Sequence, residues 1–109
     1  MTDLKEKTCA PCEKGTEPMN SKDIVKYENE LSHGWEVIEN NKIRKKFPFD
    51  NFKQSMGFAW EVALVAETEN HHPDLCIHYS NVEVELSTHA IGGLSENDFI
   101  VAAKIDELV

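Results

Sequence analysis

Residues 75–88 read LCIHYSNVEVELST, and this stretch decides the fold. From position 82 to position 87, valine or leucine alternates with a polar residue, which is typical of a β-strand with one buried and one polar face. A second strand candidate at 75–79, LCIHY, comes before it, and Ser80 and Asn81 lie between the two. Because serine and asparagine favour turns, the stretch predicts two strands of an antiparallel hairpin.

The segment before this hairpin has the spacing of a long helix. It begins at Asp50 or Asn51, and Pro73 disfavours helical geometry at His72, so we expect the helix to end near His71. The apolar residues expected on its inner face are Phe52, Met56, Ala59, Val62, Ala63, Val65 and Ala66.

Two further helices and a second hairpin are expected on either side. A first helix can start at Asn20 or Ser21 and stop at Gly34. Strands at 35–39 and 42–47 follow, joined through Asn40-Asn41, since asparagine tolerates tight turns. After Gly92-Gly93, Ser95 caps a last helix, and Asp98 at its third position is the partner in that cap.

The order is helix, strand, strand, helix, strand, strand, helix. It predicts an α+β fold, a four-stranded antiparallel sheet with three helices on one face. Residues 1–19 contain prolines and glycine and show no apolar period, so we expect an irregular N-terminal arm. The folded domain then spans residues 20–109.

Composition limits the functions that the chain can have. Lysine and arginine total 11 against 20 acidic residues, and the formal charge of −9 would repel nucleic acid and anionic membranes. We therefore expect no direct nucleic-acid partner. No apolar run is long enough to span a bilayer and the N-terminus has no hydrophobic signal segment, so we expect a cytoplasmic protein. The odd number of cysteines, three, predicts no structural disulfide.

Three histidines are the candidates for chemistry. The hairpin returns His89 to the place where the long helix ends, at His71 and His72, so the three imidazoles should meet. Imidazole titrates near neutrality, so paired histidines can supply a proton donor and an acceptor to one substrate. Glu67 lies four residues before His71 and would share its helix face. The plainer interpretation, in which each histidine only ends a helix or strand, is outweighed by their convergence.

A metal site is the competing interpretation. Cys9 and Cys12 have a zinc-knuckle spacing, and His71-His72 could complete a tetrahedron. Adjacent histidines rarely direct both rings at one ion, and no second such motif exists. We therefore expect no metal and a solvent-facing thiol pair.

The segment Glu67-Thr68-Glu69-Asn70-His71-His72-Pro73, followed by Tyr79, His89 and Asp98, resembles the signature of the pterin-4a-carbinolamine dehydratases. Three flanking segments are similar to that family too, so the resemblance covers about residues 20–108. These segments are Gly34-Trp35, Phe47-Pro48-Phe49, and Thr88 through Gly92-Gly93 to Asp98.

The resemblance implies dehydration of a 4a-hydroxytetrahydropterin to a quinonoid dihydropterin, which recycles the pterin used by aromatic amino acid hydroxylases. His71 and His89 would be the acid/base pair, and which is acid and which is base stays open. His72 would bind and orient the pterin, and Glu67 would support His71. Asp98 belongs to the signature, but we favour its role in the helix cap. No cofactor is expected.

The resemblance also implies a homodimer or homotetramer. Two other functions stay open. The chain could be a non-catalytic dimerization cofactor that binds a transcription factor, or it could serve pterin chemistry linked to molybdenum-cofactor metabolism.

Overall fold

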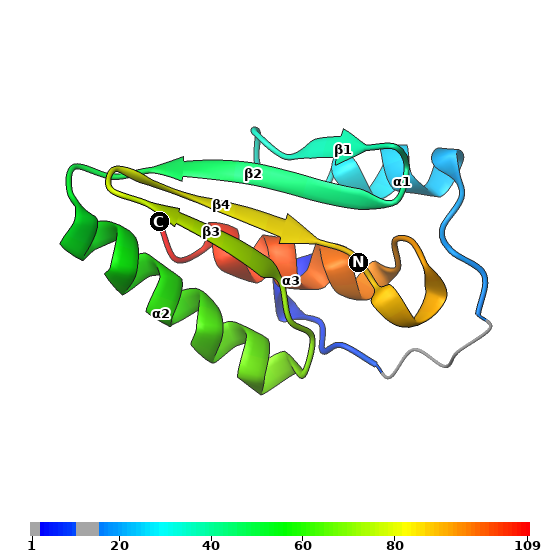
Figure 1. The fold of residues 1–109 in the computed structure, drawn as a ribbon. Coiled ribbons are helices and arrows are strands. Elements are labelled where there is room, and N and C mark those ends of the chain that lie inside the picture. Colours follow the sequence, from blue (N-terminus) through cyan, green and yellow to red (C-terminus); the bar gives the residue numbers. More distant parts are fainter. Residues whose placement is uncertain (1–2, 11–15) are drawn as a thin grey trace.

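The structure is a computed structural model that describes residues 3–10 and 16–109. Four strands form one antiparallel sheet in the order β1 (Glu36–Ile38), β2 (Lys42–Pro48), β4 (Asn81–Leu86) and β3 (Asp74–His78) (Figure 1). The alternation in β4 buries Val82, Val84 and Leu86 completely on the helix side of the sheet. The predicted hairpin is thus confirmed.

Three helices cover that face: α1 (Ser21–Glu28), α2 (Phe52–Glu69) and α3 (Glu96–Asp106) (Figure 1). Two short 3-10 helices are added, η1 (Leu4–Glu6) before α1 and η2 (His89–Ile91) between β4 and α3. The predicted α+β class and order of elements are confirmed. Among the described residues, no helix is long and apolar enough to cross a membrane.

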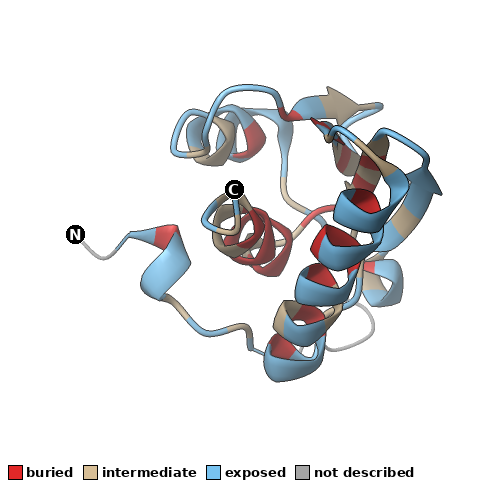
Figure 2. Cartoon of the chain, turned by 90° about the vertical axis from the view of Figure 1, so that its left-hand side faces the viewer, coloured by how far each residue is buried: buried red, intermediate tan, exposed pale blue. Residues whose placement is uncertain are grey.

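Helix α3 is the most enclosed of the three, as the burial colours in Figure 2 show. Residues 99–102 and Ile105 are all at most 1% exposed, because the helix lies against α1, α2 and the N-terminal segment. Its C-terminal end is tied to the sheet. Asp106 accepts hydrogen bonds from the indole of Trp35 at 2.9 Å and from Lys45 Nζ at 2.7 Å.

Two predicted boundaries are wrong in detail. Helix α1 ends at Glu28 rather than at Gly34, because 3-10 hydrogen bonds, such as Leu31 N to Glu28 O, tighten the chain beyond it. In the turn from β1 to β2, the residues with left-handed backbone are Glu39 and Asn40, one position earlier than the predicted Asn40-Asn41.

The predicted inner face of α2 is also partly wrong. Phe52 and Met56 are 50% and 44% exposed, and Trp60, one turn further along the same side of the helix, is 66% exposed. The buried residues are Ser55, Phe58, Ala59, Val62, Ala66 and Glu69. Apolar residues occupy more than one face of this helix, so periodicity alone did not identify the inner one.

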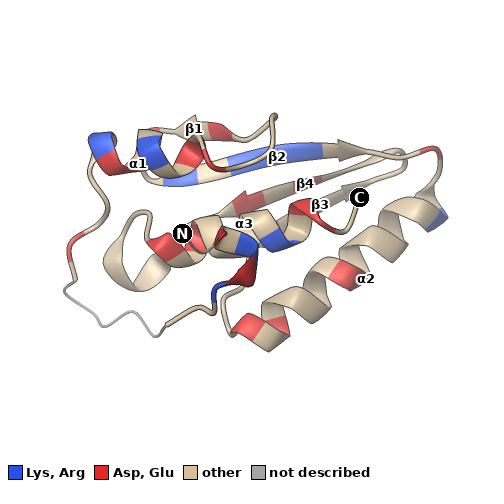
Figure 3. Cartoon of the chain, turned by 180° about the vertical axis from the view of Figure 1, so that it is seen from behind, with Lys and Arg blue, Asp and Glu red and all other residues tan. Residues whose placement is uncertain are grey.

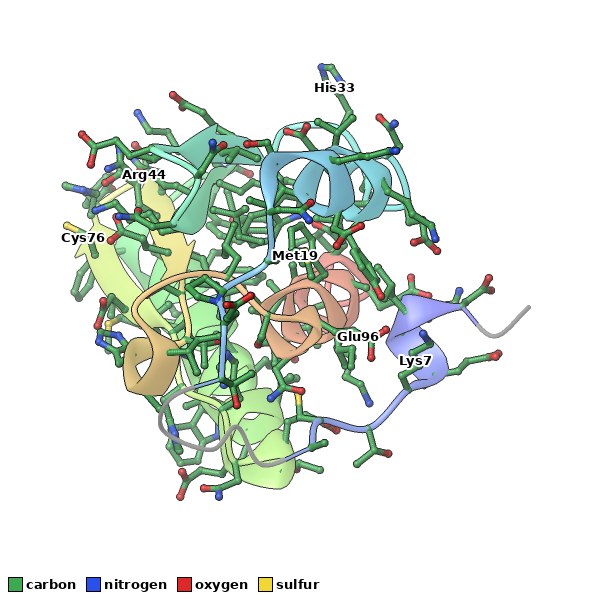
Figure 4. The ribbon with its side chains drawn as sticks, turned by 90° about the vertical axis from the view of Figure 1, so that its right-hand side faces the viewer. Lys7, Met19, His33, Arg44, Cys76 and Glu96 are labelled. Carbon is green, nitrogen blue, oxygen red and sulfur yellow. The ribbon has the colours of Figure 1, made fainter. Side chains whose placement is uncertain are left out.

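Residues 3–10 pack along α3. Leu4 is only 4% exposed and belongs to the core, and Lys7 Nζ bonds Glu96 at 2.8 Å, a contact visible in Figure 4. Further along, Met19 N donates to Leu94 O at 2.8 Å. The segment before α1 therefore contacts the domain on both sides of residues 11–15.

Candidate active site

Three histidines from separate parts of the sequence line one cavity of about 460 Å³. His71 and His72 follow α2, and His89 opens η2 shortly after β4. Because β3 and β4 are antiparallel, the start of β3 lies beside the end of β4. The hairpin thus brings the three imidazoles together, as the sequence predicts. The other lining residues are Cys9, Ala10, Glu69, Asn70, Ser87, Thr88, Ala90 and Asn97.

His71 is held by a buried carboxylate. Its Nε2 lies 2.7 Å from Oδ1 of Asp98, and the imidazole side chain is only 12% exposed. An ionised carboxylate can only accept, so Nε2 carries the proton of this bond. In the neutral ring, Nδ1 is then the nitrogen that can accept a proton.

The same carboxylate closes the N-terminus of α3. Oδ2 of Asp98 accepts from Ser95 N at 3.0 Å and from Thr88 Oγ1 at 2.8 Å, and the side chain is fully buried. The predicted capping box is confirmed. The cap is only half of the role of Asp98, however, because this residue also fixes His71.

The predicted partner of Glu67 is wrong. Oε2 of Glu67 lies 2.5 Å from Nε2 of His72, not beside His71. The reason is the end of α2, where Asn70 adopts a left-handed backbone with φ of 51°. The chain leaves the helix before His71, so the spacing of four residues that joins side chains on a helix no longer applies.

The N-terminal segment forms one wall of the cavity, which the sequence did not predict. Cys9 N donates to Glu69 Oε1 at 2.9 Å. Ala10 and Asn97 exchange two hydrogen bonds, N to Oδ1 at 3.0 Å and Nδ2 to O at 2.6 Å. Since these bonds span 60 or more positions, no local pattern in the sequence indicates them.

Cys9 is not the solvent-facing thiol that we expected. Burial, together with the neighbouring Glu69 carboxylate, raises the pKa of its thiol to about 12, so it is protonated at neutral pH. Its Sγ lies 3.7 Å from Asn97 O. Cys12, the other half of the predicted pair, lies outside the described residues. His71 and His72 each direct Nε2 at a carboxylate, which does not favour the zinc arrangement considered from the sequence.

Glu69 joins the wall to α3. Its Oε2 accepts from Lys104 Nζ at 2.9 Å, and the residue is 9% exposed. Burial raises the pKa of Glu69, but the hydrogen bond from Cys9 N and the pairing with Lys104 outweigh it, so the pKa is lowered. The ionised form is thus the one that holds the segment.

Fold and cavity together define a small α+β protein with a histidine-lined pocket, and comparison with known proteins identifies the group. The family model for pterin 4 alpha carbinolamine dehydratase matches residues 17–108. The chain belongs to this family. A Rickettsia canadensis relative, provisionally named as such a dehydratase, is 47% identical over the whole of both chains. One from Nitrosomonas europaea is 46% identical, covering 97% of this chain and 93% of its own.

Solved structures agree with the fold. A crystal structure from Brucella melitensis, described as a transcriptional coactivator/pterin dehydratase, gives a TM-score of 0.77 at 29% identity, covering 84% of this chain and 97% of its own. A pterin dehydratase-like protein identified as a RuBisCO assembly factor in the alpha-carboxysome gives 0.59 at 23% identity, covering 70% and 89%. The second match is informative about the fold alone.

Replacing Asp98 by asparagine tests its double role. In Asp98→Asn, one oxygen becomes an amide donor, so either the helix cap or the bond to His71 is lost. We expect a loss of about 1–3 kcal/mol in the free energy of unfolding. If the cap keeps the oxygen, His71 must switch its proton to Nδ1, which ¹⁵N NMR of the ring detects.

Asp106→Asn is the matched control, because Asp106 is also an aspartate of α3 with two side-chain donors. It should lower stability without changing the tautomer of His71. Unchanged stability together with an unchanged tautomer in Asp98→Asn would contradict the assignment.

The lowered pKa of Glu69 predicts acid sensitivity of the cavity wall. A carboxyl whose pKa is lower in the folded than in the unfolded protein stabilises the folded state. This contribution is complete above the unfolded-state pKa of about 4.3 and is lost as the pH falls through the folded-state pKa. Between about pH 5 and pH 3, we expect the parent to lose roughly 1 kcal/mol more than Glu69→Gln in urea unfolding. The Cys9 amide should lose hydrogen-exchange protection over the same range.

Glu61→Gln, which changes an exposed glutamate on the same helix, serves as the control and should follow the parent. Equal pH slopes for the parent and Glu69→Gln would show that the Glu69 carboxylate does not hold the wall.

Proposed function

We propose that the histidine-lined cavity dehydrates a 4a-hydroxytetrahydropterin to the quinonoid dihydropterin. The observation that carries the proposal is the meeting of His71, His72 and His89 in one cavity. Its volume of about 460 Å³ lies within the range of small-molecule sites, roughly 300–1,000 Å³. Family membership supports the same chemistry.

The reaction needs one proton donor and one acceptor. The C4a–O bond breaks as an acid protonates the hydroxyl, which leaves as water, and a base takes a proton from a ring nitrogen as the C4a–N double bond forms. No electrons are exchanged with another molecule. We assign the acid/base pair to His71 and His89, because paired imidazoles can hold and release protons near neutrality.

The carboxylates of the site have positioning roles in this proposal. Asp98 fixes the proton of His71 at Nε2. In this proposal, Nδ1 is the nitrogen of His71 that exchanges a proton with the substrate. Glu67 restrains the more exposed His72, which we assign to binding and orienting the pterin. The support from Glu67 thus goes to His72 rather than to His71.

The test is a stopped-flow absorbance assay on freshly generated 4a-hydroxytetrahydropterin with chelator present. We expect the parent to accelerate the decay of this compound. In His71→Ala and in His89→Ala, the catalysed rate should fall by a factor of about 10²–10⁴. His33→Ala, which changes an exposed histidine far from the cavity (Figure 4), should keep it. Circular dichroism checks that each variant is folded. A parent that does not accelerate the decay would overturn the proposal.

The wider role of this activity is also a proposal. Recycling of the pterin of aromatic amino acid hydroxylases is the first candidate, with molybdenum-cofactor metabolism the second. A non-catalytic role, binding a transcription factor, gains support from the description of the Brucella melitensis structure as a coactivator. A folded parent without pterin turnover would favour that role. The cytoplasmic location and the absence of direct nucleic-acid binding stay predictions.

We further propose that the chain self-associates through α2. Phe52, Met56, Trp60 and Leu64 recur every four residues and are 44–66% exposed, so they form an apolar stripe along the helix. The charges of α2 favour a second copy of the chain as the partner that covers this stripe. In an antiparallel pair centred on Trp60, Lys53 of one copy meets Glu67 of the other, since each lies seven residues from the centre.

Charge placed on the stripe should separate the copies. We expect the parent to sediment as a multiple of its 12.4 kDa chain, and a variant carrying Trp60→Glu and Leu64→Glu to sediment as a single chain. Val25→Glu, at a 54% exposed position on α1, is the control and should keep the parent's state. A parent that sediments at 12.4 kDa contradicts the proposal.

A further inference from the structure

The outer face of the β3–β4 hairpin carries three metal-ligating side chains. Cys76 and His78 are two positions apart on β3, so both project from the same face. Glu83 of β4 is directly opposite Cys76 in the register. This face is the reverse of the one that buries Val82 and Val84, and Figure 4 shows Cys76 projecting on the side away from α3.

The donor atoms lie close to the spacing that ligands of one ion require. Sγ of Cys76 lies 3.3 Å from Nε2 of His78, and that nitrogen lies 3.9 Å from Oε2 of Glu83. All three donor atoms are within 4.8 Å of one another. Tetrahedral zinc, with bonds of about 2.0–2.3 Å, separates its ligand atoms by about 3.3–3.7 Å. Small side-chain rotations would therefore bring all three donors into coordination.

We propose that Cys76, His78 and Glu83 bind a divalent zinc-type cation. Thiolate, imidazole and carboxylate are the ligand set of Zn²⁺, and three protein ligands leave a fourth position for water or another group. Binding releases the thiol proton of Cys76 to solvent. The paired strands hold the three backbone positions in register, so little ordering is needed when the ion binds.

The charges around the cluster allow a cation to bind. Figure 3 shows basic residues along β2, in blue, next to acidic residues of β4, in red. Lys42 and Arg44 are engaged by Glu85 at 3.2 and 3.3 Å, not by Glu83. Lys46 approaches only the other oxygen of Glu83, at 3.9 Å, and its side chain is 63% exposed, so it can move away. The net charge of −9 attracts cations at longer range.

This site is separate from the proposed dehydratase site. None of its three ligands lines the histidine cavity. Cys76 is exposed, whereas the Cys9 thiol is protonated and half-buried beside Asn97. Metal binding and pterin turnover should therefore respond to different substitutions.

The test uses the full chain, reduced and freed of metal, titrated with Zn²⁺ against a chromogenic chelator. We expect one zinc per chain for the parent and binding weaker by at least about tenfold in Cys76→Ser and in His78→Ala. A variant carrying Cys9→Ser and Cys12→Ser is the matched control and should bind as the parent does. Bound Co²⁺ should give a thiolate charge-transfer absorption band. This band should disappear in Cys76→Ser and remain in the variant carrying Cys9→Ser and Cys12→Ser.

Two results would overturn the proposal. In the first, the parent binds zinc no more tightly than Cys76→Ser does. In the second, the Co²⁺ band survives in Cys76→Ser but disappears with Cys9 and Cys12, which would place the thiol ligand in the N-terminal segment. Dehydratase turnover of His78→Ala should equal that of the parent, so failure of the metal site and failure of the proposed function are distinguishable.

Discussion

The buried carboxylate of Asp98 is the contact on which both the fold and the cavity depend. It accepts from the backbone of Ser95, the hydroxyl of Thr88 and the ring of His71. Burying a carboxylate costs several kcal/mol unless hydrogen bonds compensate for lost water. Three donors from three segments meet that need, so the start of α3, the end of β4 and the exit of α2 are fixed relative to one another.

This arrangement explains why the cavity forms where it does. A cap at the third position of α3 directs Asp98 back toward the helix start, and β4 delivers Thr88 and His89 to the same place. Glu69 and Asn97 then attach the N-terminal segment as one wall of the cavity. The carboxylate that caps α3 thus also fixes His71, and the bond from Thr88 holds the chain next to His89. Such an arrangement suits acid/base chemistry, which requires fixed geometry.

Local patterns were sufficient to predict the four strands and the three α-helices, and antiparallel pairing of β3 with β4 was sufficient to predict that His71, His72 and His89 converge. The inner face of α2 and the pairing of side chains were not predicted correctly. The left-handed Asn70 redirects the chain after α2, so Glu67 meets His72 instead of His71. The hydrogen bonds from Cys9 to Glu69 and from His71 to Asp98 join residues that are 60 and 27 positions apart in the sequence. Such contacts depend on how the elements pack, which the periodicity of a single element does not indicate.

The β3–β4 hairpin illustrates how one alternation can serve two purposes. Each buried residue of β4 is followed by one on the outer face, so Val82 and Val84 in the core necessarily place Glu83 opposite Cys76 outside. A shift of one residue in the register would exchange the two faces and expose the valines. The core therefore enforces the register that places the backbone positions of Cys76, His78 and Glu83 side by side on the outer face.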